Sequence, residues 1–170
     1  MPPTNVWSEY ADKLAGGWKC LTFEIYDSDA PDAEPVYKPH GDAPLGRVLL
    51  SRNGYLSAHL SVPSLISEFQ AKDSQWRSAP DAEVAKVARG LAMYCGYLEL
   101  FREADGSLWW QTRCDIMVDP KRVGKLEKRR LRYFEEGGKQ FMVLQPINDE
   151  VTPGTAHTRA VLKWEKFEDA

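Results

Sequence analysis

Three tight-turn sequences constrain the fold of this chain more than any other feature. Asn53-Gly54, Asp105-Gly106 and Gly137-Gly138 each separate two runs in which apolar and polar residues alternate. Such dipeptides are the usual two-residue connections of β-hairpins. Hairpins are therefore expected over 47–62, 95–118 and 125–147, with further strands over 18–26 and 158–167. Seven or eight strands joined in this way indicate a single all-β domain, either a sandwich or a closed antiparallel barrel.

Two helical segments and one long loop complete the expected domain of residues 1–170. Residues 1–15 form a helical lead-in that ends at Gly16-Gly17. Residues 78–92, between the first two hairpins, are predicted to form the one clear short helix, because Pro80 and Asp81 suit its first turn. Residues 27–44 carry four prolines and four aspartates, which predicts a long surface loop.

Composition excludes several classes of function. The net charge of −3 argues against a nucleic-acid partner, and the basic run from Lys121 to Arg132 is expected to be a solvated outer face. No apolar stretch is long enough for a membrane helix, and the N-terminus lacks the features of a signal peptide. Three cysteines without metal or redox spacing predict reduced thiols in a cytoplasmic protein. No metal or cofactor motif is present, so none is expected.

The turns also predict which residues face the interior, since residues opposite one another in a hairpin share a face. A two-residue turn at Asp105-Gly106 places Tyr97 and Glu99 on the same apolar face as Thr112 and Trp110. A turn at Gly137-Gly138 places Tyr133 opposite Met142. Alternation along the first strand puts Trp18, Glu24 and Tyr26 on one side.

Each hairpin then has one charged residue on its more apolar face: Arg47, Glu99 and Arg129. A buried charge is costly unless it is paired or used. Glu99 either bridges Arg129 or Arg47 as a structural ion pair, or faces a cavity and contacts a ligand. A single β-bulge would exchange the two faces.

The chain also resembles a known family. The resemblance rests on Gly16-Gly17-Trp18, Leu45-Gly46, Asn53 to Ala58, Tyr94 to Glu99, Pro120 to Gly124, Arg129 and Leu162 to Lys166. Together these segments resemble the lipocalin-like domain family of small stand-alone proteins of bacteria and fungi. The resemblance implies a closed antiparallel lipocalin-like β-barrel. It also implies a role in the secondary metabolism of polyketides and related natural products, with cyclase or isomerase activity in some members.

The family positions that this sequence matches are Tyr94, Tyr97, Glu99 and Arg129. The sequence departs from the family at two places: Trp110 stands where many relatives have a histidine, and Leu50 where they have a tyrosine. Chemistry that depends on those two side chains is not expected here.

Two functions follow from the barrel and its expected interior. The first is a cofactor-independent cyclase, isomerase or dehydratase acting on a small, largely apolar, polyketide-like intermediate. Glu99 would move a proton, Arg129 or Arg47 would stabilise an enolate oxygen and Tyr97 would donate a hydrogen bond. The expected substrate-binding residues are Arg47, Glu24, Tyr26, Trp110, Thr112, Tyr133 and Met142. The second function is a non-catalytic carrier that encloses such a molecule.

Overall fold

The computed structural model describes residues 3–30, 32–147 and 158–169. The helices are α1 (Trp7–Leu14), α2 (Pro63–Gln70) and α3 (Asp81–Arg89), and a 3₁₀ turn, η1, spans Pro120–Arg122. The strands are β1 (Gly16–Tyr26), β2 (Leu45–Leu50), β3 (Tyr55–Ser61), β4 (Ala92–Arg102), β5 (Leu108–Arg113), β6 (Ile116–Met117), β7 (Leu126–Glu136), β8 (Lys139–Pro146) and β9 (Arg159–Asp169).

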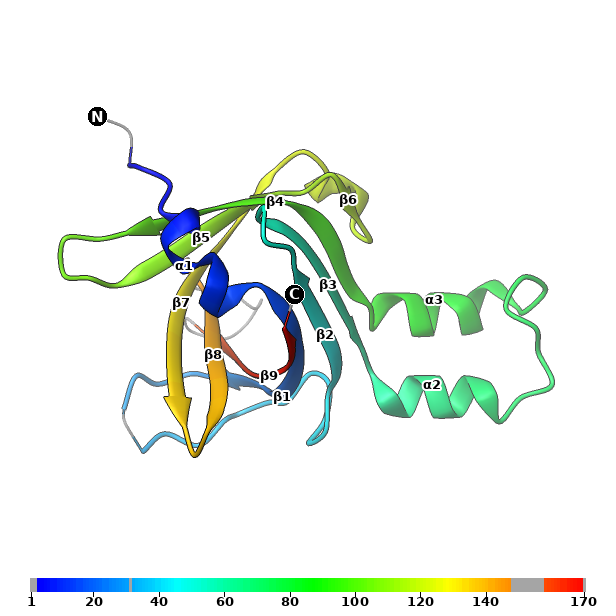
Figure 1. Cartoon of the computed structure of the whole chain (residues 1–170). Coiled ribbons are helices and arrows are strands. Elements are labelled where there is room, and N and C mark those ends of the chain that lie inside the picture. The colour runs from blue at the N-terminus through cyan, green and yellow to red at the C-terminus, as the bar shows by residue number, and fades with distance from the viewer. Residues whose placement is uncertain (1–2, 31, 148–157, 170) are drawn as a thin grey trace.

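Eight of these strands form a closed antiparallel barrel (Figure 1). Their order is β3-β2-β1-β9-β8-β7-β5-β4, and pairing of β3 with β4 closes the ring. The short strand β6 is not part of this ring and pairs with Tyr94 and Cys95, near the start of β4. This architecture confirms the closed antiparallel barrel expected from the hairpin turns.

The barrel interior is apolar and is closed at one end by α1. The buried side chains on the inner face include Trp18, Val48, Leu50, Leu56, Ala58, Leu98, Leu100, Trp110, Leu131, Met142, Leu144 and Trp164. Trp7 and Leu14 of α1 belong to the same buried cluster. The indole of Trp18 donates a hydrogen bond to the Leu14 carbonyl at 2.9 Å, which ties the helix to β1. The helical lead-in therefore covers one end of the barrel (Figure 1).

Helices α2 and α3 form an arm that projects from the barrel between β3 and β4 (Figure 1). Helix α3 corresponds to the helix expected over 78–92, whereas α2 was not expected from the sequence. Pro63 occupies the first turn of α2, where its missing N–H has no intrahelical partner to lose. Phe69 of α2 and Trp76 in the connection pack edge to face at 5.5 Å, and Lys86 of α3 forms an ion pair with Glu68 of α2.

The register expected for two hairpins was wrong by one residue. Gly54 donates to the Ser51 carbonyl at 2.9 Å and Ser51 donates to the Tyr55 carbonyl at 2.9 Å, so three residues connect the strands instead of two. Gly54 has φ of 84°, while no residue other than glycine in the described chain has positive φ. A two-residue type I′ turn needs positive φ at both positions, so Asn53 cannot take part in one.

The Asp105-Gly106 turn has the same form. Gly106, with φ of 85°, donates to the Glu103 carbonyl at 3.0 Å, and Glu103 donates to the Ser107 carbonyl at 2.9 Å. The extra loop residue moves each side chain of one strand to the opposite face relative to its partner strand. Leu100, not Phe101, is therefore opposite Trp110, and Glu99 lies opposite Gln111.

A bulge also exchanges the faces of β1. The ladder between β1 and β9 shifts between Cys20 and Thr22, so Phe23 faces the interior while Glu24 and Tyr26 face outward. By contrast, Gly137 and Gly138 both have positive φ, and their two-residue turn places Tyr133 opposite Met142 as expected.

Candidate functional site

Five of the residues expected at the site face away from the barrel interior. Glu99 is exposed and accepts a hydrogen bond from Gln111 at 2.8 Å. The Tyr97 ring is 57% exposed, and Arg47 is exposed on the outer face of β2. Tyr26 donates to Glu24 at 2.7 Å on the outside of β1. The expected placement of these residues was wrong, because three-residue turns and a bulge replace the assumed regular register.

The other five expected residues do face the interior. Trp110, Thr112 and Met142 are fully buried, and Trp110 lies directly opposite Arg129 in the ladder of β5 and β7. Tyr133 lies toward the α1 end, where Lys13 Nζ is 5.9 Å from its ring centroid. Six residues of extended β7 separate Tyr133 from Glu127, a distance of about 20 Å. The structure thus groups Trp110, Thr112 and Arg129 near the end of β5 and the start of β7.

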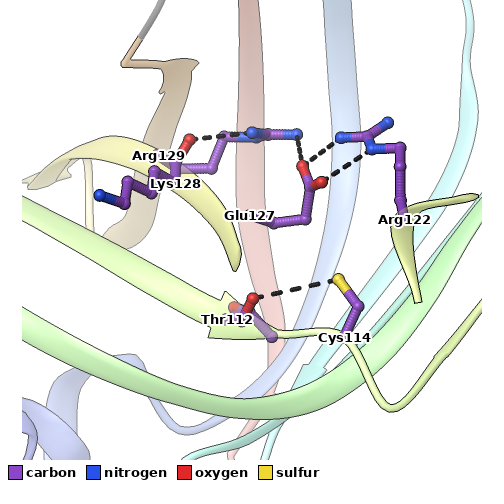
Figure 2. Close-up of polar contacts among 6 residues, drawn as sticks. All are labelled: Thr112, Cys114, Arg122, Glu127, Lys128 and Arg129. Carbon is purple, nitrogen blue, oxygen red and sulfur yellow. Dashed lines mark hydrogen bonds and ion pairs between the residues drawn. The ribbon is translucent and has the colours of Figure 1, made fainter. Parts of the chain in front are cut away.

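Glu127 is the centre of the polar groups at this end. It lies opposite Thr112 in the ladder, and its side chain is 7% exposed. Arg122 donates from Nε to Oε1 at 2.8 Å and from Nη2 to Oε2, and Arg129 donates from Nη2 to Oε2 at 3.2 Å. Figure 2 shows the Glu127 carboxylate held between the two guanidinium groups. Two cations thus share one carboxylate within the described part of the chain.

Local sequence explains why the cluster forms. Alternation along β7 puts Glu127, Arg129 and Leu131 on the inner face. The Asp119 side chain accepts the Lys121 N–H at 3.0 Å and begins η1, which brings Arg122 back against β7. Glu127 and Arg122 were not expected at the site. Glu127 could have been found, because it lies two residues before Arg129 on the same face.

Three buried polar atoms on β5 and β9 have no hydrogen-bond partner among the described residues. They are the indole Nε1 atoms of Trp110 and Trp164 and the hydroxyl of Thr112. Their side chains are at most 1% exposed, so solvent outside the barrel does not reach them. An unpaired buried donor or acceptor costs about 1–3 kcal/mol, and buried polar groups are usually paired by protein, water or ligand. Because these side chains have almost no accessible surface, neighbouring side chains would have to move before a molecule inside the barrel could contact the three atoms.

The same end of the barrel contributes groups whose ionisation is suppressed. Burial raises the pKa of the Tyr94 phenol, which faces inward from β4, so this hydroxyl remains a hydrogen-bond donor. Burial also raises the pKa of the Cys114 thiol to about 11. His40, from the 27–44 loop, packs against the ring of Phe23 at 5.0 Å, and burial lowers its pKa.

Neither a metal cluster nor a membrane-spanning helix occurs in the part of the chain that the structure describes. No group of three or more potential ligands gathers in residues 3–30, 32–147 and 158–169. His40 and His59 lie in this part, whereas His157 is outside it. No helix in the same residues is long and apolar enough to cross a membrane.

A closed eight-stranded antiparallel barrel with a helix across one end is the architecture of lipocalin-type β-barrels. The chain belongs to the lipocalin-like domain family, whose model matches residues 15–167. This match confirms the resemblance found in the sequence. Comparison with curated proteins and with solved structures found no match for this chain.

Proposed function

We propose that this protein binds a small, largely apolar organic molecule whose polar end contacts the Arg122–Glu127–Arg129 cluster. The observation that carries the proposal is the set of unpaired polar atoms of Trp110, Thr112 and Trp164 in the interior. Trp110 and Thr112 lie opposite Arg129 and Glu127, so their unpaired atoms and the charged groups belong to one region, whereas Trp164 lies opposite Met142. A ligand that accepts hydrogen bonds there would remove the cost of these unpaired groups.

The groups at this region favour a ligand with an acceptor-rich polar end. The indoles of Trp110 and Trp164 and the guanidinium of Arg129 donate hydrogen bonds and accept none. The Tyr94 hydroxyl stays protonated because burial raises its pKa. A carboxylate, an enolate or a conjugated carbonyl suits these donors. Leu131, Leu144 and Met142, all on the inner face, would contact the apolar part of the molecule.

A second proposal is that the same region catalyses the cofactor-independent cyclisation, isomerisation or dehydration of a polyketide-like intermediate. The observation that favours it is the convergence of a carboxylate, two guanidinium groups and a phenol. Glu127 would accept a proton, Arg129 would stabilise the developing enolate oxygen and Tyr94 would donate a hydrogen bond to it. Glu127 thus takes the role that the sequence had suggested for Glu99.

Parinaric acid, a conjugated polyene carboxylate, tests the binding proposal, with its methyl ester as the uncharged counterpart. Both should quench tryptophan emission, because Trp110 faces the interior. Arg129→Met keeps the apolar stem and should weaken the acid about tenfold, the usual effect of losing one charge-assisted hydrogen bond, with a smaller effect on the ester. Arg89→Met, exposed on α3, is the control. Unchanged tryptophan emission at saturating concentrations of both probes would reject the proposal.

The catalytic proposal has its own test. The N-acetylcysteamine thioester of a linear triketide serves as the substrate, and product formation is followed by mass spectrometry. Glu127→Gln should lower turnover by about 10²-fold or more, the usual scale for a lost acid or base, and binding of parinaric acid should persist. A protein that binds the polyene but converts no thioester is a carrier in the sense of the first proposal.

A further inference from the structure

A basin of about 980 Å³ lies on the outer face of the barrel, where β5, β7, β8, β9 and β1 run side by side. Most of its lining residues alternate with the residues of the core, and the core residues Leu108 and Leu131 also line it. Trp109 precedes the buried Trp110, and Arg130 and Lys163 precede Leu131 and Trp164. The charged and aromatic residues of this basin therefore lie on the outer face of the sheet.

The floor of the basin is positively charged. Lys128, Arg130 and Arg132 alternate along β7, and Lys163 projects from β9. None of these four side chains forms an ion pair with another residue in the described part of the chain. The acidic lining residues are at the two flanks: Glu103 and Asp105 near the β4–β5 turn, and Glu24 on β1. The central strands thus present cations without carboxylate partners.

Aromatic and apolar contacts hold these cations in place. Arg132 lies 5.0 Å from the ring centroid of Phe134, and Lys163 lies 4.9 Å from that of Phe141. Val143 is opposite both Arg132 and Lys163 in the ladders of β7, β8 and β9, so the two cations flank an apolar side chain. Adjacent strands are about 4.8 Å apart, which separates the two cationic backbones by about 10 Å. This spacing leaves room for one anionic group between them.

Trp109 supplies an aromatic wall beside the charged floor. It lies directly opposite Arg130 in the ladder of β5 and β7 and packs against Phe101 with ring centroids 4.4 Å apart. The Lys128 ammonium is 5.7 Å from the Trp109 ring. A flat ring placed against Trp109 would therefore have its substituents next to Arg130, whose planar fork suits carboxylate, sulfonate or phosphate groups.

We propose that this basin is a second binding site, selective for planar aromatic organic anions. The ring packs against Trp109, and the anionic group lies among Arg130, Arg132 and Lys163. The volume is within the range of small-molecule sites, and the site does not depend on any molecule inside the barrel.

Two fluorescent probes with the same rings test the proposal. Anilinonaphthalene sulfonate carries the anion, and N-phenylnaphthylamine lacks it. The double variant Arg130→Gln/Arg132→Gln should weaken the sulfonate about tenfold or more, because two charge-assisted contacts are lost, and leave the neutral amine within about twofold. The control Lys121→Gln/Lys125→Gln removes the same charge from exposed positions outside the basin. Trp109→Leu should weaken the sulfonate several-fold by removing the aromatic wall.

A salt titration of the unaltered protein gives a second measurement. Added salt should weaken the sulfonate more than the amine, because ions screen the exposed cations. If Arg130→Gln/Arg132→Gln and Lys121→Gln/Lys125→Gln lose equal affinity for the sulfonate, the probe is attracted by positive charge in general. That result would overturn the proposal. Binding of the sulfonate that neither Arg130→Gln/Arg132→Gln nor salt alters would place that probe inside the barrel and would overturn it as well. Neither result bears on the binding of parinaric acid.

Discussion

Arg122 donates two hydrogen bonds to Glu127 and thereby fastens the segment between β6 and β7 to the inner face of the barrel. The carboxylate is nearly fully buried, whereas the guanidinium is 40% exposed. A buried carboxylate that receives three hydrogen bonds from two arginines is a structural element as well as a candidate ligand contact. It fills the role of the buried ion pair that the sequence had suggested for Glu99.

Replacing Glu127 should therefore destabilise the protein. Breaking a fully buried ion pair costs about 3–5 kcal/mol, and the partial exposure of both arginines reduces the expected loss for Glu127→Gln to about 1–3 kcal/mol. Urea unfolding measures this change. Glu68→Gln, which removes an exposed partner of Lys86, is the control and should have little effect. Equal stability of the two variants would contradict a structural role for Glu127.

Thr112→Val should have the opposite effect on the ligand-free protein. The Thr112 hydroxyl is buried without a partner in the described structure, so its replacement by a methyl group removes an unpaired polar atom. We expect a gain of up to about 1 kcal/mol in the free energy of unfolding, while parinaric acid binds more weakly. Thr112→Ala is the control, because it leaves space behind and should destabilise. A loss of stability in Thr112→Val would show that the hydroxyl has a partner.

His40 should make stability depend on pH. Burial lowers its pKa below the unfolded value of 6.5, so the unfolded chain binds a proton more readily than the folded protein. The stability that neutral His40 contributes is fully present above the pKa of the unfolded chain. It is lost as the pH falls through the pKa of His40 in the folded protein. Between about pH 7 and pH 5, the melting temperature of the wild type should fall more than that of His40→Leu. The melting temperature of His59→Gln, changed at an exposed position, should depend on pH as that of the wild type does. If the melting temperature of His40→Leu falls in parallel with that of the wild type, the prediction is wrong.

The three cysteines should differ in their reaction with iodoacetamide. Burial raises the pKa of Cys20 to about 12 and that of Cys114 to about 11, and both side chains are buried. Cys95 is only half-buried on the outer face, within 3.3 Å of the Tyr55 hydroxyl. Mass spectrometry of the native protein should find rapid alkylation at Cys95 alone, because alkylation requires an accessible thiolate. Cys95→Ser should take up no reagent until it unfolds, and fast labelling of Cys114 would contradict its burial.

The sequence predicted the closed barrel correctly, but it predicted incorrectly which residues of several strands face the interior. Alternation and turn glycines were enough for the strand order of each hairpin, and Gly137-Gly138 also predicted the register, because two adjacent glycines can both adopt positive φ. Asn53-Gly54 and Asp105-Gly106 predicted turns at the right places but the wrong length. Both two- and three-residue loops place glycine at the same final position, so the dipeptide alone does not distinguish them.

The candidate site was only partly predictable for a related reason. Arg129, Trp110 and Thr112 follow from local alternation on β7 and β5, and the structure confirms their inward placement. Arg122 reaches the site through η1, outside any regular alternation, so no periodic pattern indicates it. The bulge after Cys20 is equally invisible in the pattern, because both faces of β1 contain aromatic residues.

The pairing of β1 with β9 has a consequence for synthesis in the cell. The ladder runs from Gly16 opposite Asp169 to Tyr26 opposite Arg159, so β1 completes its pairing only after β9 has been translated. Until β9 leaves the ribosome, β1 and β8 each keep one hydrogen-bonding edge open, and such edges invite pairing with other chains. Closure of the barrel thus requires that β9 has been synthesised, and chaperones that shield nascent strands would act on this chain during that interval.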